Sequence, residues 1–235
     1  MTAPEAQRYA RLAGILLLLS VIAGGYGESY IPAKLLAPTD IAETARRVAS
    51  SLGLIRASFA AYLLEAACDL TLTAIFYVLL RPVSRPLSLI IACFGLFSTA
   101  TYAVSEIVYF VASLPYSDAD MIKVLSPEIR QTITYVSLTV FGYIFVLFTG
   151  FYGLAEILRG YLIFRSRYLP RWLGILVALG GAGFLLKNIV FLAAPHHDSP
   201  FFVLPTLIAM LSMALYLLIK GINQPAWQAA EPHQP

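Results

Sequence analysis

Two acidic residues, Glu65 and Asp69, lie one helical turn apart in the otherwise apolar stretch from Ile55 to Leu80. A spacing of four residues places both carboxyl groups on one face of a helix. A charged side chain at the centre of a bilayer costs on the order of 3 to 10 kcal/mol, so acids in such a segment face protein or a water-filled cavity. Carboxyl groups held there can bind a cation, exchange a proton, or pair with other polar groups.

Three more ionisable residues, Glu28, Glu106 and Lys187, lie within other apolar stretches of the chain. If the helices that carry them converge, the molecule contains a polar pocket with four carboxyl groups and one ammonium group. In that pocket Glu106 would lie at the mouth and Lys187 would balance the acids. We therefore predict a ligand-binding set in the outer half of the molecule. Its members are Glu28, Glu65, Asp69, Glu106 and Lys187.

The alternative is that these charges only fix helix packing. Acids inside a membrane protein can pair with one another, with hydroxyl groups or with a single lysine. Hydrogen bonds between membrane helices contribute only about 0.6 kcal/mol on average, so such pairing is a modest stabiliser. The sequence favours a structural role for Glu156, which precedes Arg159 by three residues. Glu28 could also extend to the membrane interface.

The composition identifies the elements that must position these residues. Hydrophobic residues make up 59% of the 235-residue chain and charged residues 12%. Soluble domains contain about 25% charged residues, so the chain belongs to the membrane class. The small net charge of +3, spread over loops, argues against nucleic-acid binding. The apolar residues fall into long blocks, each near the roughly 20 residues that span a bilayer.

We predict an all-α bundle of six transmembrane helices with proline-marked ends. Their approximate bounds are Tyr9–Ile31, Ile55–Leu80, Leu87–Leu114, Gln131–Leu158, Trp172–Ala194 and Phe201–Lys220. Arginines crowd the loops RPVSRP (81–86) and RGYLIFRSRYLPR (159–171), which places both loops and both termini in the cytoplasm. Residues 1–222 form the membrane domain, and residues 223–235 are predicted to be a disordered cytoplasmic tail.

A short helix is expected over residues 39–52, outside the membrane. Thr39 or Asp40 can cap it, and apolar residues recur along one face. It could lie on the membrane surface or pack on the end of the bundle.

Signals for catalysis or metal binding are weak. His196 and His197 occupy a short outer turn, but a metal site needs three or four converging ligands. Whether these histidines bind metal stays open, and we predict neither a metal site nor a cofactor. Nucleotide-binding, GxSxG and HExxH motifs are absent from the sequence, so whether the protein is an enzyme is undecided.

Three blocks in order carry a family resemblance: ARLAGILLLLSVIAGGYGE, YVLLRPVSRPLSL and RGYLIFRSRYLPRWLGILVALGGAGFL. They resemble the bacterial membrane proteins of the DUF4386 domain of unknown function, over about residues 9 to 221. The stretch GYLIFRSRYLPRWLG is the most specific. Positions within the matching blocks include Glu28, Asp69, Arg81 and the turn 165–170. The resemblance implies a multi-pass protein of the bacterial inner membrane, and it indicates no activity.

Three functions are consistent with the sequence. The leading hypothesis is a membrane protein whose acidic pocket opens to the outer side and binds or passes a small molecule, for which a cation is one option, or protons. The second is an intramembrane enzyme that acts on a lipid or polyprenyl substrate. The third is an assembly or sensory partner whose charges pair with another subunit. The chain is small for an inverted-repeat transporter, and a homodimer would ease that objection.

Overall fold

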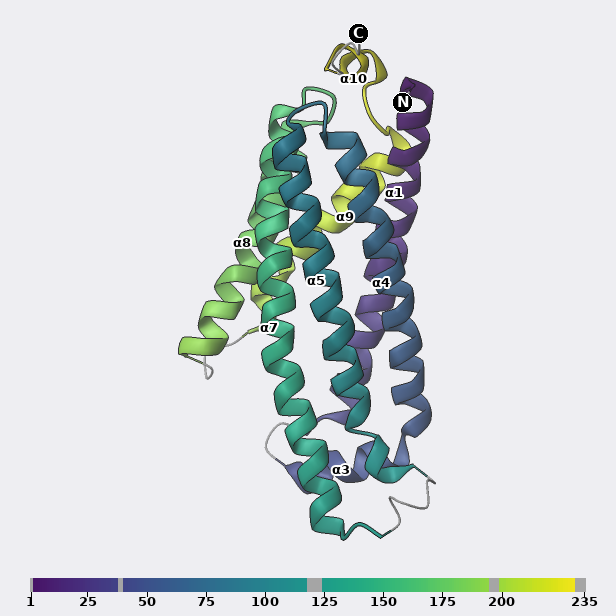
Figure 1. Cartoon of the computed structure of the whole chain (residues 1–235), viewed down its shortest axis with the longest axis vertical. Helices are drawn as coiled ribbons and strands as arrows, with labels where there is room; N and C mark the ends of the chain where they lie inside the picture. The colour runs from purple at the N-terminus through teal and green to yellow at the C-terminus, as the bar shows by residue number, and fades with distance from the viewer. Residues whose placement is uncertain (1, 38–39, 118–123, 195–198, 231–235) are drawn as a thin grey trace.

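Helices account for nearly all of the chain that the structure describes. The computed structural model covers residues 2–37, 40–117, 124–194 and 199–230, and no strand occurs within them. Both termini lie at one end of an elongated bundle, called here the terminal end, and α3 lies across the other, the α3 end (Figure 1). The predicted all-α fold class is therefore confirmed.

Six helical segments are long and apolar enough to cross a membrane, as predicted. They are Ala3–Leu35, Leu52–Leu80, Arg85–Tyr116, Pro127–Arg165, Arg171–Ala193 and Phe201–Ile219. Their principal helices are α1 (Ala3–Gly24), α4 (Leu52–Leu80), α5 (Arg85–Val111), α7 (Pro127–Arg165), α8 (Arg171–Ala193) and α9 (Leu204–Ile219). Neighbours pack as a closed ring in the order α1, α4, α5, α7, α8, α9 and back to α1.

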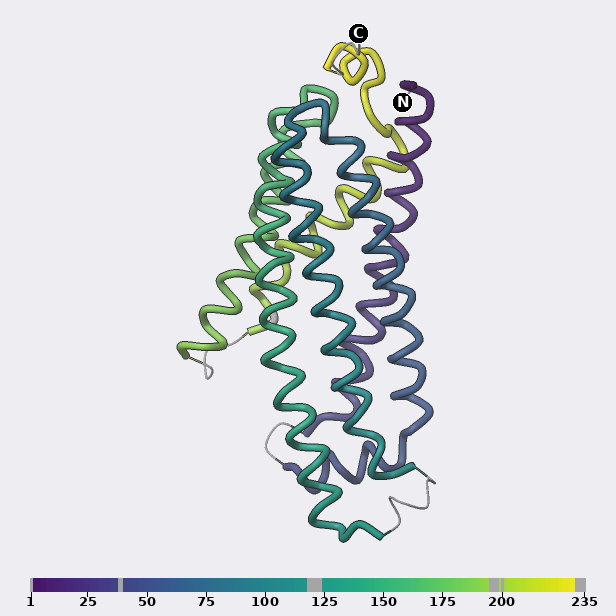
Figure 2. Tube along the Cα trace, viewed as in Figure 1, coloured from purple at the N-terminus to yellow at the C-terminus, as the bar shows by residue number. Residues whose placement is uncertain are grey.

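The six helices differ greatly in length. Helix α7 has 39 residues, about 58 Å at 1.5 Å per residue, whereas α9 has 16. Figure 2 shows that α8 ends and α9 begins part-way along the bundle. All six helices therefore surround the core toward the terminal end, while the first span, α4, α5 and α7 continue to the α3 end.

Helix α7 is longer at both ends than the predicted range Gln131–Leu158. It begins at Pro127, after Ser126 accepts a hydrogen bond from the Ile129 amide. At the other end no proline or glycine pair interrupts the apolar run that follows Gly160, so the helix continues to Arg165. Part of the expected loop 159–171 is therefore helical, and Arg159 lies inside the bundle, 8% exposed.

The first span contains an irregular segment at the α3 end. Helix α1 passes into the π-helical segment η1 (Gly25–Tyr30) and then into α2 (Ile31–Leu35). The predicted stop at Pro32 is wrong, because a proline in the first turn of α2 has no intrahelical amide bond to lose. Two α4 hydroxyl groups hold the π-helical segment in place: Tyr62 and Ser58 donate to the Gly27 carbonyl at 2.8 and 3.3 Å.

Glycines allow α7 and α8 to pack closely. A Cβ atom added at Gly160 would lie 2.5 Å from the Gly174 carbonyl oxygen, and one added at Gly174 would lie 2.6 Å from the Gly160 carbonyl oxygen. Gly181 lies against Gly153 in the same way, and a Cβ at Gly180 would lie 2.9 Å from the Thr206 Cα on α9. The glycine pair at 180–181 thus serves close helix packing, as small residues do in membrane proteins.

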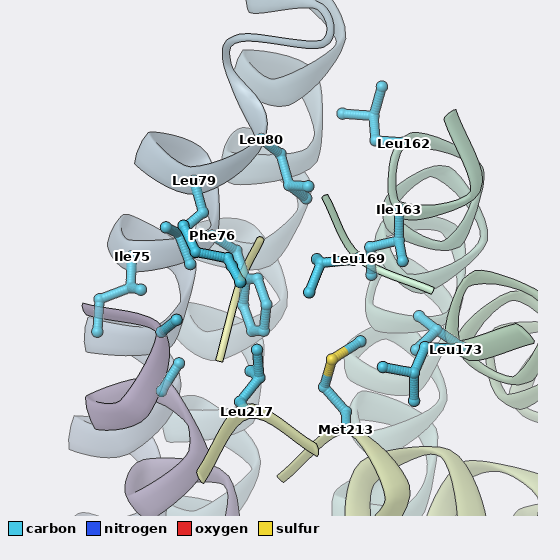
Figure 3. Packing of buried hydrophobic residues seen from close by; sticks show 14 of the residues in the cluster. Ile75, Phe76, Leu79, Leu80, Leu162, Ile163, Leu169, Leu173, Met213 and Leu217 are labelled. Carbon is cyan, nitrogen blue, oxygen red and sulfur yellow. The ribbon is translucent and has the colours of Figure 1, made fainter. Parts of the chain in front are cut away.

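The hydrophobic core lies toward the terminal end (Figure 3). Leu79, Leu162, Leu173 and Leu217 come from four different helices and are completely buried. The Tyr168 hydroxyl donates to the Leu79 carbonyl at 2.7 Å. Burial raises the pKa of Tyr168, so the phenol keeps the proton that it donates.

The segment after α9 differs from the predicted disordered tail. Residues Gln224–Ala230 form helix α10, and Trp227 is completely buried with its indole N–H 3.3 Å from the Leu79 carbonyl. The backbone N–H of Asn223 also donates to the Tyr168 carbonyl. A buried aromatic residue orders this segment, which composition alone does not reveal. Residues 231–235 lie outside the described chain.

Helix α3 (Ile41–Ser50) is the predicted short helix, with Asp40 as its N-cap. Thr39 lies outside the described residues. Its buried residues are Thr44, Ala45 and Val48, and it packs on α7, α2 and α4. This arrangement matches the second of the two expectations, a helix packed on the end of the bundle.

Candidate functional site

A chamber lies inside the bundle, between α1, η1, α4, α7, α8 and α9. It contains about 810 Å³ of empty space, which includes the open space at its mouth. Its lining residues are Ser20, Val21, Gly24, Gly25, Glu28, Ser29, Glu65, Asp69, Phe145, Phe148, Tyr152, Phe184, Val203, Thr206, Leu207 and Met210. Three of the five predicted site residues, Glu28, Glu65 and Asp69, are therefore brought together.

Glu65 is the most buried acid of the chamber, at 9% exposure. Its Oε2 accepts a hydrogen bond of 2.7 Å from the Tyr102 hydroxyl on α5. Gly24 on α1 leaves the space that the carboxyl group occupies, because a Cβ atom there would lie 2.6 Å from Glu65 Oε1. The glycine and the tyrosine together hold the carboxyl group against α1.

Asp69 lies one turn further along α4, as its spacing predicts. Its Oδ1 accepts a hydrogen bond of 3.1 Å from the Ser20 hydroxyl on α1. Each of these two α4 acids therefore has a hydroxyl donor from a neighbouring helix. Neither has an ion-pair partner in the described parts of the chain.

Glu28 comes to the chamber from the π-helical segment rather than from a regular helix. Its Oε1 is buried and has no hydrogen-bond partner among the residues that the structure covers. The bonds from Tyr62 and Ser58 to the preceding carbonyl, at Gly27, fix the backbone that carries Glu28. Irregular π-helical turns occur often at functional sites in membrane and soluble helices.

The remaining walls of the chamber are mostly apolar. Phe145 and Phe148 come from α7, Phe184 from α8, and Leu207 and Met210 from α9. The Phe148 ring stacks on Tyr102 with 4.6 Å between ring centroids, so an aromatic residue lies directly beside the Glu65 donor. The chamber is thus divided into a carboxyl wall on α1, η1 and α4 and an apolar wall on α7, α8 and α9.

Glu106 does not lie at the mouth of the pocket, as the sequence led us to expect. It is 3% exposed, and neither carboxyl oxygen has a hydrogen-bond partner among the described residues. It does not line the chamber but is an electrostatic neighbour of Glu65 and Tyr62. The structure thus places it behind the carboxyl wall, among the α4 and α5 tyrosines.

Lys187, predicted to balance the acids, is not among the residues that line the chamber. Its ammonium group lies 5.9 Å from the centroid of the Phe191 ring, one turn away on α8. Asn188 next to it turns toward α7, where it accepts a bond from Thr149 and donates to the Val146 carbonyl. The structure therefore groups the three lining acids without the predicted lysine.

A second, smaller cavity adjoins the chamber and contains Arg159, which was not among the predicted site residues. It encloses about 340 Å³, open space included, and shares Tyr152, Thr206 and Met210 with the chamber. Glu156 and Arg159 line it as an ion pair, and the Arg159 guanidinium lies 4.7 Å from the Phe76 ring centroid. The three-residue spacing of Glu156 and Arg159 indicated this pair, but the expected loop over 159–171 did not predict that Arg159 is buried.

A metal site finds no support in the described chain. No group of three histidine, cysteine or acidic residues with suitable geometry occurs in residues 2–37, 40–117, 124–194 and 199–230. His196 and His197 lie outside the described residues.

Comparison with known proteins gives the family. Residues 12–221 match the family described as "Domain of unknown function (DUF4386)". The chain belongs to this family. A protein of Archaeoglobus fulgidus with the name "Uncharacterized protein" is 26% identical over 158 residues, which are 65% of this chain and 76% of that protein. No solved structure matches the chain.

The match confirms the resemblance read from the three sequence blocks, and it covers both walls of the chamber. Neither the family description nor the archaeal relative names an activity.

Proposed function

We propose that this membrane protein binds a small organic cation in the chamber, or passes protons through it. One observation carries the proposal. Glu28, Glu65 and Asp69 line a single cavity, and none of them forms an ion pair with another residue in the described ranges. Buried carboxyl groups that lack a cationic partner are costly unless a proton or a ligand neutralises them.

The aromatic residues opposite the acids favour a cation over a neutral ligand. Phe148, Tyr152 and Phe184 line the chamber, and aromatic faces attract cations within about 6 Å. Glu28 adds a buried oxygen without a hydrogen-bond donor. A quaternary or protonated ammonium group would satisfy both walls at once.

We further place the protein in the cytoplasmic membrane with both termini in the cytoplasm. Arginines are more frequent at the terminal end, as in Arg81, Arg85, Arg165 and Arg171, than at the α3 end. Single cysteines at Arg46 and Gln228, in a background without Cys68 and Cys93, test this orientation. An impermeant maleimide should label the Arg46 position in intact cells and leave Gln228 unlabelled until lysis. The reverse pattern would contradict it.

Cation binding can be tested with purified protein and a matched ligand series. The ligands are alkyltrimethylammonium ions of increasing chain length, each paired with its uncharged analogue in which carbon replaces nitrogen. A ligand at one hundred times its Kd stabilises the folded protein by about 2.7 kcal/mol, which a thermal unfolding assay resolves. We expect the charged member of at least one pair to raise the melting temperature more than its neutral analogue.

The variants Glu65→Gln and Asp69→Asn should abolish this preference for charge. Glu128→Gln is the matched control, because Glu128 is an exposed acid at the far end of α7 and lies outside the chamber. Equal responses to charged and neutral ligands in the wild-type protein would contradict cation binding. In that case, the proposal that the chamber passes protons is tested by measuring proton uptake into sealed vesicles that contain wild-type protein or Asp69→Asn.

A further inference from the structure

The mouth of the chamber lies on the side of the bundle. Among its lining residues only Gly25, Ser29 and Leu207 are exposed, and they come from η1 and from the first turns of α9. This position follows from the short α9, which begins at Leu204, part-way along the bundle (Figure 1). The mouth is thus a lateral gap between η1 and α9.

The surface around this mouth is largely aliphatic, with Ser29, Tyr26 and Tyr30 as the exposed polar or amphipathic side chains of η1. On the first span Ile22 is 67% exposed, and on α9 Leu204 and Leu211 are 43% and 36% exposed. Exposed aliphatic side chains on a membrane-spanning helix face lipid tails, whereas a mouth open to water would be rimmed by polar groups. A ligand that passes between η1 and α9 therefore comes from the hydrocarbon region of the bilayer.

The interior of the chamber is likewise divided into a carboxyl side and an apolar side. Glu65 and Asp69 lie at the back, on α4, whereas Glu28 comes from η1 beside the mouth, and Val203, Leu207 and Met210 form the wall that leads to the mouth. A small hydrophilic cation would use only the back of the chamber. A molecule with a cationic head and a hydrocarbon tail would satisfy the acids and leave its tail along the α9 wall.

We propose that the ligand is an amphipathic amine or quaternary ammonium compound that enters sideways from the membrane, head first, between η1 and α9. This inference rests on the proposed cation binding and specifies the ligand class and the route. The head neutralises Glu65 and Asp69, and the tail lies against Leu207 and extends into the lipid. By this route the cation reaches the chamber from the lipid and does not pass through water at the α3 end of the bundle.

The experiment uses the full chain in nanodiscs of zwitterionic lipid. The probe is dodecyltrimethylammonium with a photoactivatable diazirine near the end of its chain, and labelled residues are mapped by mass spectrometry. Labelling should concentrate on residues 203–211 and 21–26 and should fall when unlabelled dodecyltrimethylammonium is added. Tetramethylammonium, which does not partition into lipid, should compete poorly.

Two tryptophan variants on α9 test the route. Leu207→Trp narrows the mouth, and we expect labelling to fall by about tenfold, which corresponds to about 1.4 kcal/mol of binding free energy. Leu215→Trp is the control, since Leu215 is also exposed on α9 but lies outside the chamber lining, and its labelling should match wild type.

The outcomes separate this inference from the proposed function. If tetramethylammonium competes fully and Leu207→Trp has no effect, the cation enters from water, and lateral entry is refuted while cation binding stands. If the charged probe labels no more than a neutral alcohol of the same chain length, and Asp69→Asn changes nothing, cation binding itself is refuted. Labelling confined to the α3 end would also overturn the lateral route.

Discussion

Two adjoining cavities of this bundle hold buried charge in opposite ways. In the smaller cavity Glu156 is paired with Arg159, three residues later on the same helix. In the chamber Glu65 and Asp69 accept hydrogen bonds only from hydroxyl groups on neighbouring helices. The cavities share Tyr152, Thr206 and Met210, so their surroundings are similar. The two cavities thus differ in the pairing of their buried charges rather than in burial alone.

The two arrangements should also differ in what they contribute to stability. An ion pair within one helix forms as soon as α7 folds, and breaking a buried pair leaves an uncompensated charge. The chamber acids depend on tertiary contacts, and a neutral amide can replace a hydroxyl-bonded carboxyl group with little loss. Substitutions in the pair should therefore affect stability, and those in the chamber should affect binding.

The largest expected effect follows from removing the arginine of the buried pair. Arg159→Met should destabilise the protein by about 3 to 5 kcal/mol, because Glu156 is left buried without its cation. Thermal unfolding in detergent measures the loss. The double variant Glu156→Gln/Arg159→Met should recover most of it. The control Arg46→Met, in an exposed pair with Glu43, should cost less than about 1 kcal/mol. A loss no larger than that of the control would show that the pair is not structural.

Adjacent glycines provide the next comparison. A Cβ atom at Gly24 would lie 2.6 Å from Glu65 Oε1, whereas at Gly25 nothing lies within 4 Å. Gly24→Ala should displace the carboxyl group, cost about 1 to 3 kcal/mol as overpacked sites do, and weaken cation binding. Gly25→Ala should leave the free energy of unfolding near wild type, because the added Cβ meets no atom within 4 Å. If the two variants behave alike in unfolding and ligand-binding assays, Gly24 does not position Glu65.

Removing the hydroxyl donor to Glu65 should have a smaller effect. Tyr102→Phe keeps the ring that stacks on Phe148 but leaves Glu65 Oε2 without its donor, at a cost of about 1 kcal/mol. Cation binding should persist with altered affinity, as measured by ligand-induced thermal shifts. Tyr143→Phe, at an exposed ring, is the control and should change neither quantity. Loss of all binding in Tyr102→Phe would assign the phenol a direct role.

The smallest change in stability is expected for Asp69→Asn. The amide oxygen can still accept the bond from Ser20, so the free energy of unfolding should change by less than about 0.5 kcal/mol. The preference for charged over neutral ligands should nevertheless disappear. Parallel unfolding and ligand titrations of Asp69→Asn and Glu156→Gln test the comparison directly. A silent Asp69→Asn, with unchanged ligand response, would make the chamber acids structural as well.

The fold was largely predictable because its signals are local. Hydrophobic blocks identified all six spans, and Asp40 correctly marked the start of α3. Errors arose where a distant contact decides the outcome. Trp227 orders α10 by contacting Leu79, which lies 148 residues earlier in the chain. Likewise, the π-helical turn before Pro32 is bonded at Gly27 by Ser58 and Tyr62, which lie 31 and 35 residues away in the chain.

The candidate site was predictable only in part. The spacing of Glu65 and Asp69 correctly placed both on one helix face, and Glu28 joins them in the chamber. Arg159 was missed because arginine near an expected loop reads as a topology marker. Glu106 and Lys187 were assigned to the pocket because of their predicted depth in the membrane. Depth does not specify whether a side chain points toward the chamber, and neither residue lines it.

The sequence by itself determined the membrane class, the six helices and the one-turn spacing of the two central acids, because hydrophobicity and helical periodicity are properties of short segments. The tertiary structure alone decided which charges are paired and which acids accept hydrogen bonds only from hydroxyl groups in one chamber. It also decided where that chamber opens. The physical reason is that the pairing of charges and the access to the chamber depend on which face each of α1, α4, α7 and α9 turns inward and on where each helix ends. Close contacts between helices, such as that of Gly24 with Glu65, fix these orientations.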